Sequence, residues 1–171
     1  MGHIEHKRRA PAKVGCFILT VSDSRTFGSD ESGDLIVESL RKKRHQIIGR
    51  SLVKDDITQI RRVVKKALAD GQVQVIIING GTGIAKRDCT IEAINPMLNK
   101  KLDGFGELFR YLSYRQIGSA AFLSRAMAGV SKGRIVISLP GSSNAVRLAM
   151  QRLILPELTH LASNAKLKTK V

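Results

Sequence analysis

The sequence predicts an α/β fold in which a mostly parallel sheet carries helices on both of its faces. In the first half of the chain, segments typical of strands alternate with segments typical of helices, the order that a parallel sheet requires. Residues 14–22 are a continuous apolar run, as expected for a strand covered on both faces, and residues 73–79 indicate a buried strand most clearly. Residues 46–53 are a weaker strand, and residues 57–70 are typical of an amphipathic helix. A length of 171 residues fits one such domain with a sizeable core.

The first half of the chain is expected to form a strand, a helix, a strand, a helix and a strand. In the first helix, Asp34 suits the positive end of the helix dipole. Asp56 or Thr58 can cap the start of the second helix, and Gly71 ends it. In order, these elements cover residues 14–22, 33–44, 46–53, 57–70 and 73–79.

The second half of the chain is predicted to be richer in helix. It begins with an amphipathic helix and a short helix of small residues, followed by a strand and a tight turn. These elements cover residues 105–117, 119–129, 134–138 and 139–142. A last helix is expected to break near Pro156, because proline cannot donate a helical hydrogen bond.

The domain is expected to span residues 13–163, between basic, flexible tails at residues 1–12 and 164–171. No apolar run reaches the length of a bilayer-spanning helix or of a signal peptide, so we expect a cytoplasmic protein without a membrane partner. Two cysteines, Cys16 and Cys89, are too few for a disulfide framework and are interpreted as small apolar fillers.

Charge is the unusual feature of the composition. The formal net charge is +15, which favours anionic ligands such as nucleotides, phosphates or nucleic acid. Aromatic residues make up only 4% of the chain, which argues against a platform for stacking bases. No recognisable nucleic-acid-binding motif is present, so nucleic acid is not expected as the main ligand.

Three polar loops follow predicted strands and are therefore expected at one edge of the sheet. They cover residues 22–33 after the first strand, 80–88 after the third and 139–145 after the last. Ligands of open parallel sheets bind beyond the carboxyl ends of the strands. The sequence thus predicts that these loops surround a single binding site.

The second loop begins with Gly80, Gly81, Thr82 and Gly83. Glycines allow backbone amides to approach a ligand, and successive exposed amides form a nest for an anion such as a phosphate. The loop lacks the Lys-Ser/Thr ending of a Walker A motif and is not a dinucleotide fingerprint. On loop chemistry alone, a tight turn that needs unusual backbone angles explains these glycines equally well.

Carboxylates near such a loop point to a metal ion. Asp88 follows the glycines, and Asp55 and Asp56 lie at the end of the second strand, on the same predicted edge. A carboxylate repels phosphate unless a cation lies between them, and Mg²⁺ bridges the two groups in this way. Asp56 can instead cap the following helix, and Asp55 can be a solvated surface residue.

The third loop contains Pro140, Gly141 and Ser142, which form either a second phosphate nest or a plain turn with a capping serine. Arg125 is expected near a helix end. An arginine there either clamps a phosphate or forms a surface ion pair.

Taken in order, the motifs resemble one family. "TVSDSRT", "GGTG" followed by "RDCTIEA", "GFGELFR", "SRAMAG" and "LPGSS" occur in sequence over about residues 13–160. The chain is similar to the MoaB/MogA family of molybdenum-cofactor biosynthesis, which includes the G domains of gephyrin-type proteins. The resemblance implies a three-layer αβα sandwich that assembles as a homotrimer or homohexamer.

The resemblance also implies that molybdopterin and ATP are converted, with Mg²⁺, to adenylyl-molybdopterin and pyrophosphate. A downstream molybdenum-insertion protein is a further partner that the family implies. By motif, Asp55 and Asp88 match catalytic, metal-binding aspartates, and Gly80 to Gly83 match the nucleotide-phosphate loop. The residues that match substrate-binding loops are Ser22, Asp23, Ser24, Pro140, Gly141 and Ser142.

Two alternatives remain open at this point. Many family members have proline in place of Lys54, so the second carboxylate is Asp55 or, one place along, Asp56. Some MoaB-type relatives lack the aspartate after the glycines, and with it catalysis, whereas Asp88 is present here. An active enzyme is therefore favoured over a non-catalytic molybdopterin-binding or carrier protein.

Overall fold

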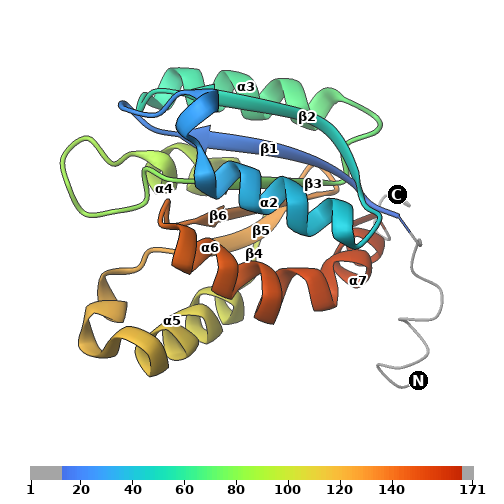
Figure 1. Cartoon of the computed structure of the whole chain (residues 1–171). Coiled ribbons are helices and arrows are strands. Elements are labelled where there is room, and N and C mark those ends of the chain that lie inside the picture. Colours follow the sequence, from blue (N-terminus) through green and yellow to red (C-terminus); the bar gives the residue numbers. More distant parts are fainter. Residues whose placement is uncertain (1–12, 167–171) are drawn as a thin grey trace.

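The computed structural model describes residues 13–166, which form a six-stranded sheet with helices on both faces (Figure 1). The strands lie in the order β2-β1-β3-β6-β5-β4. Four of them, β2, β1, β3 and β6, are parallel neighbours, and β5 is antiparallel to both of its neighbours. The strand bounds are Gly15–Val21 (β1), Gln46–Val53 (β2), Val75–Asn79 (β3), Lys100–Lys101 (β4), Met127–Ser131 (β5) and Arg134–Leu139 (β6).

The helices divide between the two faces of the sheet, because alternate residues of each buried strand point to opposite sides. On β1, Ile18 packs in the core beneath α2, α5, α6 and α7, whereas Leu19 packs in the core beneath α3 and α4. This confirms the predicted α/β sandwich with a mostly parallel sheet. The helix bounds are Glu31–Lys42 (α2), Ile57–Ala69 (α3), Thr90–Ile94 (α4), Asp103–Ile117 (α5), Ser143–Ala149 (α6) and Leu155–Lys166 (α7).

The predicted elements of the first half are all present, with ends that differ by a few residues. The second strand has the predicted bounds, Gln46–Val53. Asp56, rather than Thr58, caps α3, because its Oδ1 accepts a hydrogen bond from the amide of Gln59 at 2.7 Å. Cys16 is fully buried, and burial raises the pKa of its thiol to about 12, consistent with its interpretation as an apolar filler.

The predicted short helix over residues 119–129 is wrong. A 3₁₀ helix covers Gly118–Leu123, and the chain then enters β5, which pairs with β6 through a tight hairpin. Lys132 and Gly133 form the turn, both with positive φ (48° and 71°), as two-residue hairpin turns with the correct twist require. Ala128 and Gly129 are weak strand formers, but pairing with β6 outweighs this local preference.

The chain stays helical through Pro156, and its hydrogen-bonding pattern changes in the turn before this residue. A π-helical turn over Met150–Ile154 joins α6 to α7, so the predicted break is a local change of hydrogen bonding directly before the proline. The predicted domain end at residue 163 falls inside α7, which continues to Lys166. Residues 1–12 and 167–171, predicted as tails, lie outside the described part of the chain. Within residues 13–166, no helix is both long and apolar enough to cross a membrane.

Candidate functional site

A cavity of about 580 Å³ lies beyond the carboxyl ends of the parallel strands. The three predicted loops meet there, although they are far apart in the sequence. Every residue predicted for the site lines this cavity: Ser22, Asp23, Ser24, Asp55, Gly80, Gly81, Thr82, Gly83, Asp88, Pro140, Gly141 and Ser142. The topology explains their meeting, because β1, β3 and β6 are parallel neighbours whose following loops share one edge.

The glycine loop follows β3 in a conformation that side chains would block. Gly80 has φ of 97°, and a Cβ on it would lie 2.1 Å from the carbonyl oxygen of Val21. Gly81 has φ of 62°, and a Cβ there would lie 2.3 Å from Oδ1 of Asp55. The interpretation of these residues as a tight turn is therefore correct, and the turn brings the backbone directly against a carboxylate of the cavity.

The polar groups of this loop are arranged asymmetrically. Thr90 binds the first two carbonyls of residues 80–83 through its hydroxyl and amide, at 2.8 and 2.9 Å. Arg125 binds the last two through Nε and Nη2, at 2.8 and 2.6 Å. Of the four amides, that of Gly80 donates to Leu139 at 3.0 Å, and the other three have no hydrogen-bond acceptor among residues 13–166. With its carbonyls held by protein, the loop has amides to offer to an anion.

Arg125 is a structural support of this loop and not a free phosphate clamp. Besides the two loop carbonyls, its guanidinium binds Oε1 of Glu92 at 2.5 Å. That hydrogen bond holds the pKa of Glu92 below its usual value. The ion-pair interpretation of Arg125 is confirmed, but its contact with the glycine loop could not be inferred from the sequence.

Asp55 is the carboxylate that the cavity perturbs most clearly. Its Oδ1 is buried without a hydrogen-bond partner among the described residues. Burial raises the pKa of Asp55, and the nearby charges of Asp23 and Asp88 raise it further, while Arg87 opposes them. Asp88 lies at the other side of the glycine loop, where its Oδ2 accepts a hydrogen bond from Ala85 at 3.0 Å.

Asp55 and Asp56, adjacent in the sequence, have different environments in the structure. Asp56 caps α3 and does not line the cavity, whereas Asp55 does. Asp55 is held at the cavity edge by its own amide, which donates to Oδ1 of Asp23 at 3.1 Å. Of the two alternatives, the carboxylate that faces a ligand is therefore Asp55.

The carboxylates of the cavity suit a metal ion that takes most of its ligands from water and substrate. In the part of the chain that the structure describes, no group of three or more His, Cys, Asp or Glu side chains is placed to hold an ion. A fully protein-bound metal is therefore not built into these residues. Mg²⁺ takes one or two carboxylates together with water and substrate phosphates, and the unpartnered oxygen of Asp55 fits that mode.

The serines of the outer loops stabilise turns. The hydroxyl of Ser22 accepts from the amides of Ser24 and Arg25, at 3.3 and 3.2 Å. The hydroxyl of Ser142 accepts from the amide of Ala145 at 3.3 Å and caps α6, which confirms the simpler interpretation of that serine. Each hydroxyl still has a proton to donate.

Some lining residues were not predicted from the sequence. Arg25 and Arg87 bring positive charge to the cavity, and Leu123 and Ser124 close one side of it. Both arginines are adjacent to predicted site residues, within "SDSRT" and "AKRD", and this adjacency is the feature of the sequence that places them at the cavity. No local pattern places Leu123 at the cavity, because its position depends on how the segment before β5 folds back onto the sheet.

A parallel sheet whose carboxyl-end loops enclose such a cavity defines an α/β protein that binds its ligand at the strand ends. The comparisons with known proteins are more specific. A family model described as "Probable molybdopterin binding domain" matches residues 17–160. The chain belongs to this family, and within it to the MoaB/MogA group of molybdenum cofactor biosynthesis proteins.

The relatives match over nearly the full chain. "Molybdenum cofactor biosynthesis protein B" of Halalkalibacterium halodurans is 50% identical over 158 residues, which cover 92% of this chain and 93% of the relative. A crystal structure of a molybdenum cofactor biosynthesis protein B superposes with a TM-score of 0.88 at 49% identity, covering 92% and 98% of the two chains. That of the tungsten cofactor synthesizing protein MoaB from Pyrococcus furiosus gives 0.84 at 38% identity, covering 92% and 99%.

Proposed function

We propose that the protein adenylylates molybdopterin, using ATP and Mg²⁺ and releasing pyrophosphate. Its family places it in molybdenum cofactor biosynthesis, and the proposal specifies the reaction as nucleotidyl transfer. One observation carries it: the amides of Gly81, Thr82 and Gly83 are free of acceptors among the described residues, directly beside the unpartnered oxygen of Asp55. A nucleotide triphosphate needs both amide donors and a cation held by carboxylates.

In the proposed reaction, an oxygen of the terminal phosphate of molybdopterin attacks the α-phosphorus of ATP. A new P–O bond forms there, and the bond from that phosphorus to the pyrophosphate oxygen breaks. Both reactants are anions, so positioning and charge neutralisation supply most of the catalysis. Mg²⁺, when bound at Asp55 and Asp88, supplies neutralisation of the phosphate charge.

The remaining lining residues have roles that follow from their chemistry. The amides of residues 81–83 bind the nucleotide phosphates, and the guanidinium of Arg87 offsets the negative charge around Asp55. Ser22, Asp23 and Ser24 of the first loop and residues 140–142 of the third loop bind molybdopterin. The net charge of +15 attracts both anionic substrates to the protein.

The test is product formation from molybdopterin, ATP and Mg²⁺ by the parent and by two matched variants. Asp88→Asn should lower the rate by at least about a hundredfold, because a charge that acts on the transition state is lost. Asp56→Asn, which alters a carboxylate outside the cavity, should retain the parent rate. Equal rates from the parent and Asp88→Asn would remove Asp88 from the mechanism. Molybdopterin binding without product from any of the three proteins would favour the carrier function.

We also propose that the chain forms a homotrimer or homohexamer and contributes its product to a molybdenum-insertion protein. Exposed apolar side chains on and after α5 support self-association, because exposed apolar patches commonly mark interfaces. They are Leu108, Tyr111, Tyr114 and Ile117, which are 54–62% exposed, and Phe122, which is 74% exposed. Light scattering should give a trimeric or hexameric mass for the parent and a smaller one for Tyr111→Lys. A monomeric parent would contradict this part of the proposal.

A further inference from the structure

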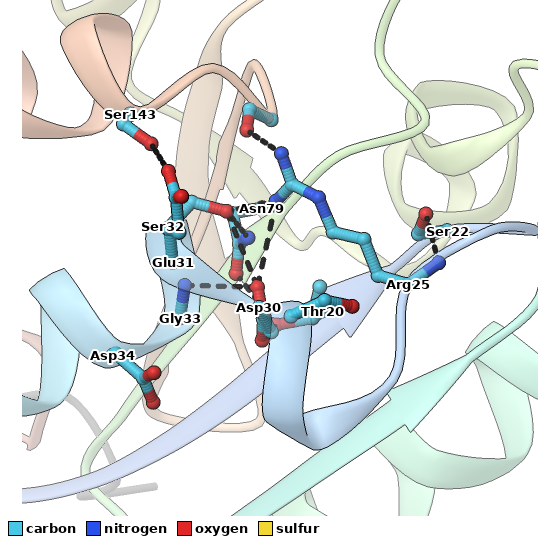
Figure 2. Close-up of polar contacts among 12 residues, drawn as sticks. Thr20, Ser22, Arg25, Asp30, Glu31, Ser32, Gly33, Asp34, Asn79 and Ser143 are labelled. Atoms are coloured by element: carbon cyan, nitrogen blue, oxygen red, sulfur yellow. Dashed lines mark hydrogen bonds and ion pairs between the residues drawn. The ribbon is translucent and has the colours of Figure 1, made fainter.

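A buried carboxylate lies beneath the cavity and takes no part in the proposed chemistry. Asp30 is fully buried, and one of its oxygens accepts a hydrogen bond from Thr20, its neighbour in Figure 2, at 2.5 Å. Arg50 donates to the same oxygen at 2.8 Å. Asp30 also caps α2 by accepting from the amide of Gly33 at 3.0 Å. Burial alone would raise the pKa of Asp30, but these hydrogen bonds outweigh it, and the pKa lies below its usual value.

Arg25 connects this buried carboxylate to the cavity. Its Nη1 forms an ion pair with Oδ1 of Asp30 at 3.4 Å and a hydrogen bond with the hydroxyl of Ser32. Its Nη2 donates to the carbonyl oxygen of Gly141 at 3.0 Å. Figure 2 shows the side chain reaching from the loop after β1 across Asp30. One guanidinium therefore joins the first loop of the cavity to the third, which is more than a hundred residues away in sequence.

The glycine loop is anchored to the same group of side chains. Asn79, the last residue of β3, is fully buried and donates from Nδ2 to the hydroxyl of Ser32 at 2.9 Å. Ser32 thus contacts both Arg25 and the residue that precedes Gly80 (Figure 2). The polar cluster of Arg25, Asp30, Ser32 and Asn79 thus contacts all three loops of the cavity. The first loop contains three of its members, the second follows Asn79, and the third is bound through the carbonyl of Gly141.

We propose that Arg25, oriented by Asp30, is the positioning residue that sets the third loop for binding molybdopterin. The inference rests on the proposed function for its substrate, but its geometric part concerns the loop alone. A guanidinium has donors in a fixed planar fork, so it can bind Asp30 and the carbonyl of Gly141 at once. Lysine keeps the charge but has a single ammonium centre and cannot make both contacts in this geometry.

The kinetic test uses Arg25→Lys and Arg25→Gln. Both should raise the KM for molybdopterin by about tenfold, the usual effect of losing one charged hydrogen bond, while the KM for ATP changes by less than about twofold. If Arg25→Lys behaves as the parent and only Arg25→Gln is impaired, Arg25 acts through its charge, and the positioning role is wrong.

Arg50→Lys is the matched control. Arg50 binds Oδ2 and the backbone carbonyl of Asp30, whereas Arg25 binds Oδ1. Arg50 also binds Asp34, and it does not line the cavity. The control should lose thermal stability as much as Arg25→Lys does while keeping the parent KM values. Equal KM changes in Arg50→Lys and Arg25→Lys would mean that the cluster acts through general stability, which would overturn the proposal.

Hydrogen exchange separates this inference from the proposed function. In the ligand-free protein, Arg25→Lys should speed exchange of the amides of Ala145 and Val146, which are bonded to Ser142, by about tenfold. Arg50→Lys should leave those amides at the parent rate. If exchange changes as expected but no protein forms product, the proposed function fails and the positioning of the loop stands. Unchanged exchange in Arg25→Lys would overturn the positioning role.

Discussion

Ionised Asp55 is expected to destabilise the folded protein in the absence of a ligand, and Asp55→Asn tests this directly. The carboxylate has a buried oxygen without a partner among the described residues, and its pKa is raised by burial and by the charges of Asp23 and Asp88. The folded state therefore disfavours the ionised form of Asp55. Asparagine is nearly the same shape and carries no charge, so it should relieve this repulsion at neutral pH.

The gain comes from removing the charge, because asparagine leaves the buried polar atom of residue 55 without a partner just as aspartate does. An unsatisfied buried charge costs more than an unsatisfied buried neutral group, and only this difference is relieved. Asp55 is only partly buried as a residue, and solvent screening reduces the charge contribution, so we expect about 1 kcal/mol. In a domain of this length, that free energy raises the Tm by about 2–4 °C. Asp56→Asn is the control, since it keeps a capping side chain and loses only the charge near the helix start, and it should be neutral or slightly destabilising.

The assay is thermal unfolding in the presence of a chelator and again with Mg²⁺ and ATP. With the chelator, Asp55→Asn should unfold at the higher temperature. With Mg²⁺ and ATP, the Tm of the parent should rise more than that of Asp55→Asn, because ligands stabilise the state that binds them.

The same difference in Tm should depend on pH. The pKa of Asp55 is raised in the folded state, so the destabilisation by its charge is complete above that pKa and disappears as the folded state takes up a proton. The difference with chelator should therefore narrow toward about pH 4. An Asp55→Asn variant that is no more stable than the parent with chelator would refute this reasoning.

Three further predictions concern other parts of the site. Gly81→Ala should lower the free energy of unfolding by about 1–3 kcal/mol, measured in urea, because φ is positive and the new Cβ would meet Asp55; an unchanged value would contradict this geometry. Asp30→Asn should cost about 3 kcal/mol at neutral pH, because it leaves two arginines without their buried partner. The pKa of Asp30 is lowered in the folded state, so this stabilisation is present above the unfolded pKa and lost as pH falls through the folded one, and parent and variant should converge below about pH 4. A thiol reagent followed by mass spectrometry should label Cys89 and spare fully buried Cys16 in the native protein, and equal labelling would contradict the burial.

The sequence was sufficient for those parts of the fold in which local pattern and burial agree. Residues 75–78 are four consecutive apolar, β-branched residues, as expected for a central strand of a sheet that is covered on both faces. Once the parallel order was assigned, the meeting of the three loops followed from topology. The strand order alone therefore predicts that Asp55, Gly80 and Ser142 lie at one site.

The sequence was insufficient where distant residues decide the structure. The segment of β5 contains Ala128 and Gly129, which are weak strand formers, and its pairing with β6 outweighs this local preference. The turn at Lys132 and Gly133 was the available signal, because a lysine followed by glycine can form a two-residue hairpin. The contacts of Arg25 with Gly141 and of Arg125 with residues 82 and 83 join segments that no local pattern relates.

The activity that we propose for this cavity is transfer of an adenylyl group from ATP to molybdopterin. The most direct measurement is simultaneous quantification of pyrophosphate and adenylyl-molybdopterin in reactions that lack, in turn, molybdopterin, ATP or Mg²⁺. We predict that the two products appear in equal amounts in the complete reaction and that neither appears when a component is missing. Molybdopterin bound to the protein in the complete reaction, with no pyrophosphate and no adenylylated product, would contradict the claim.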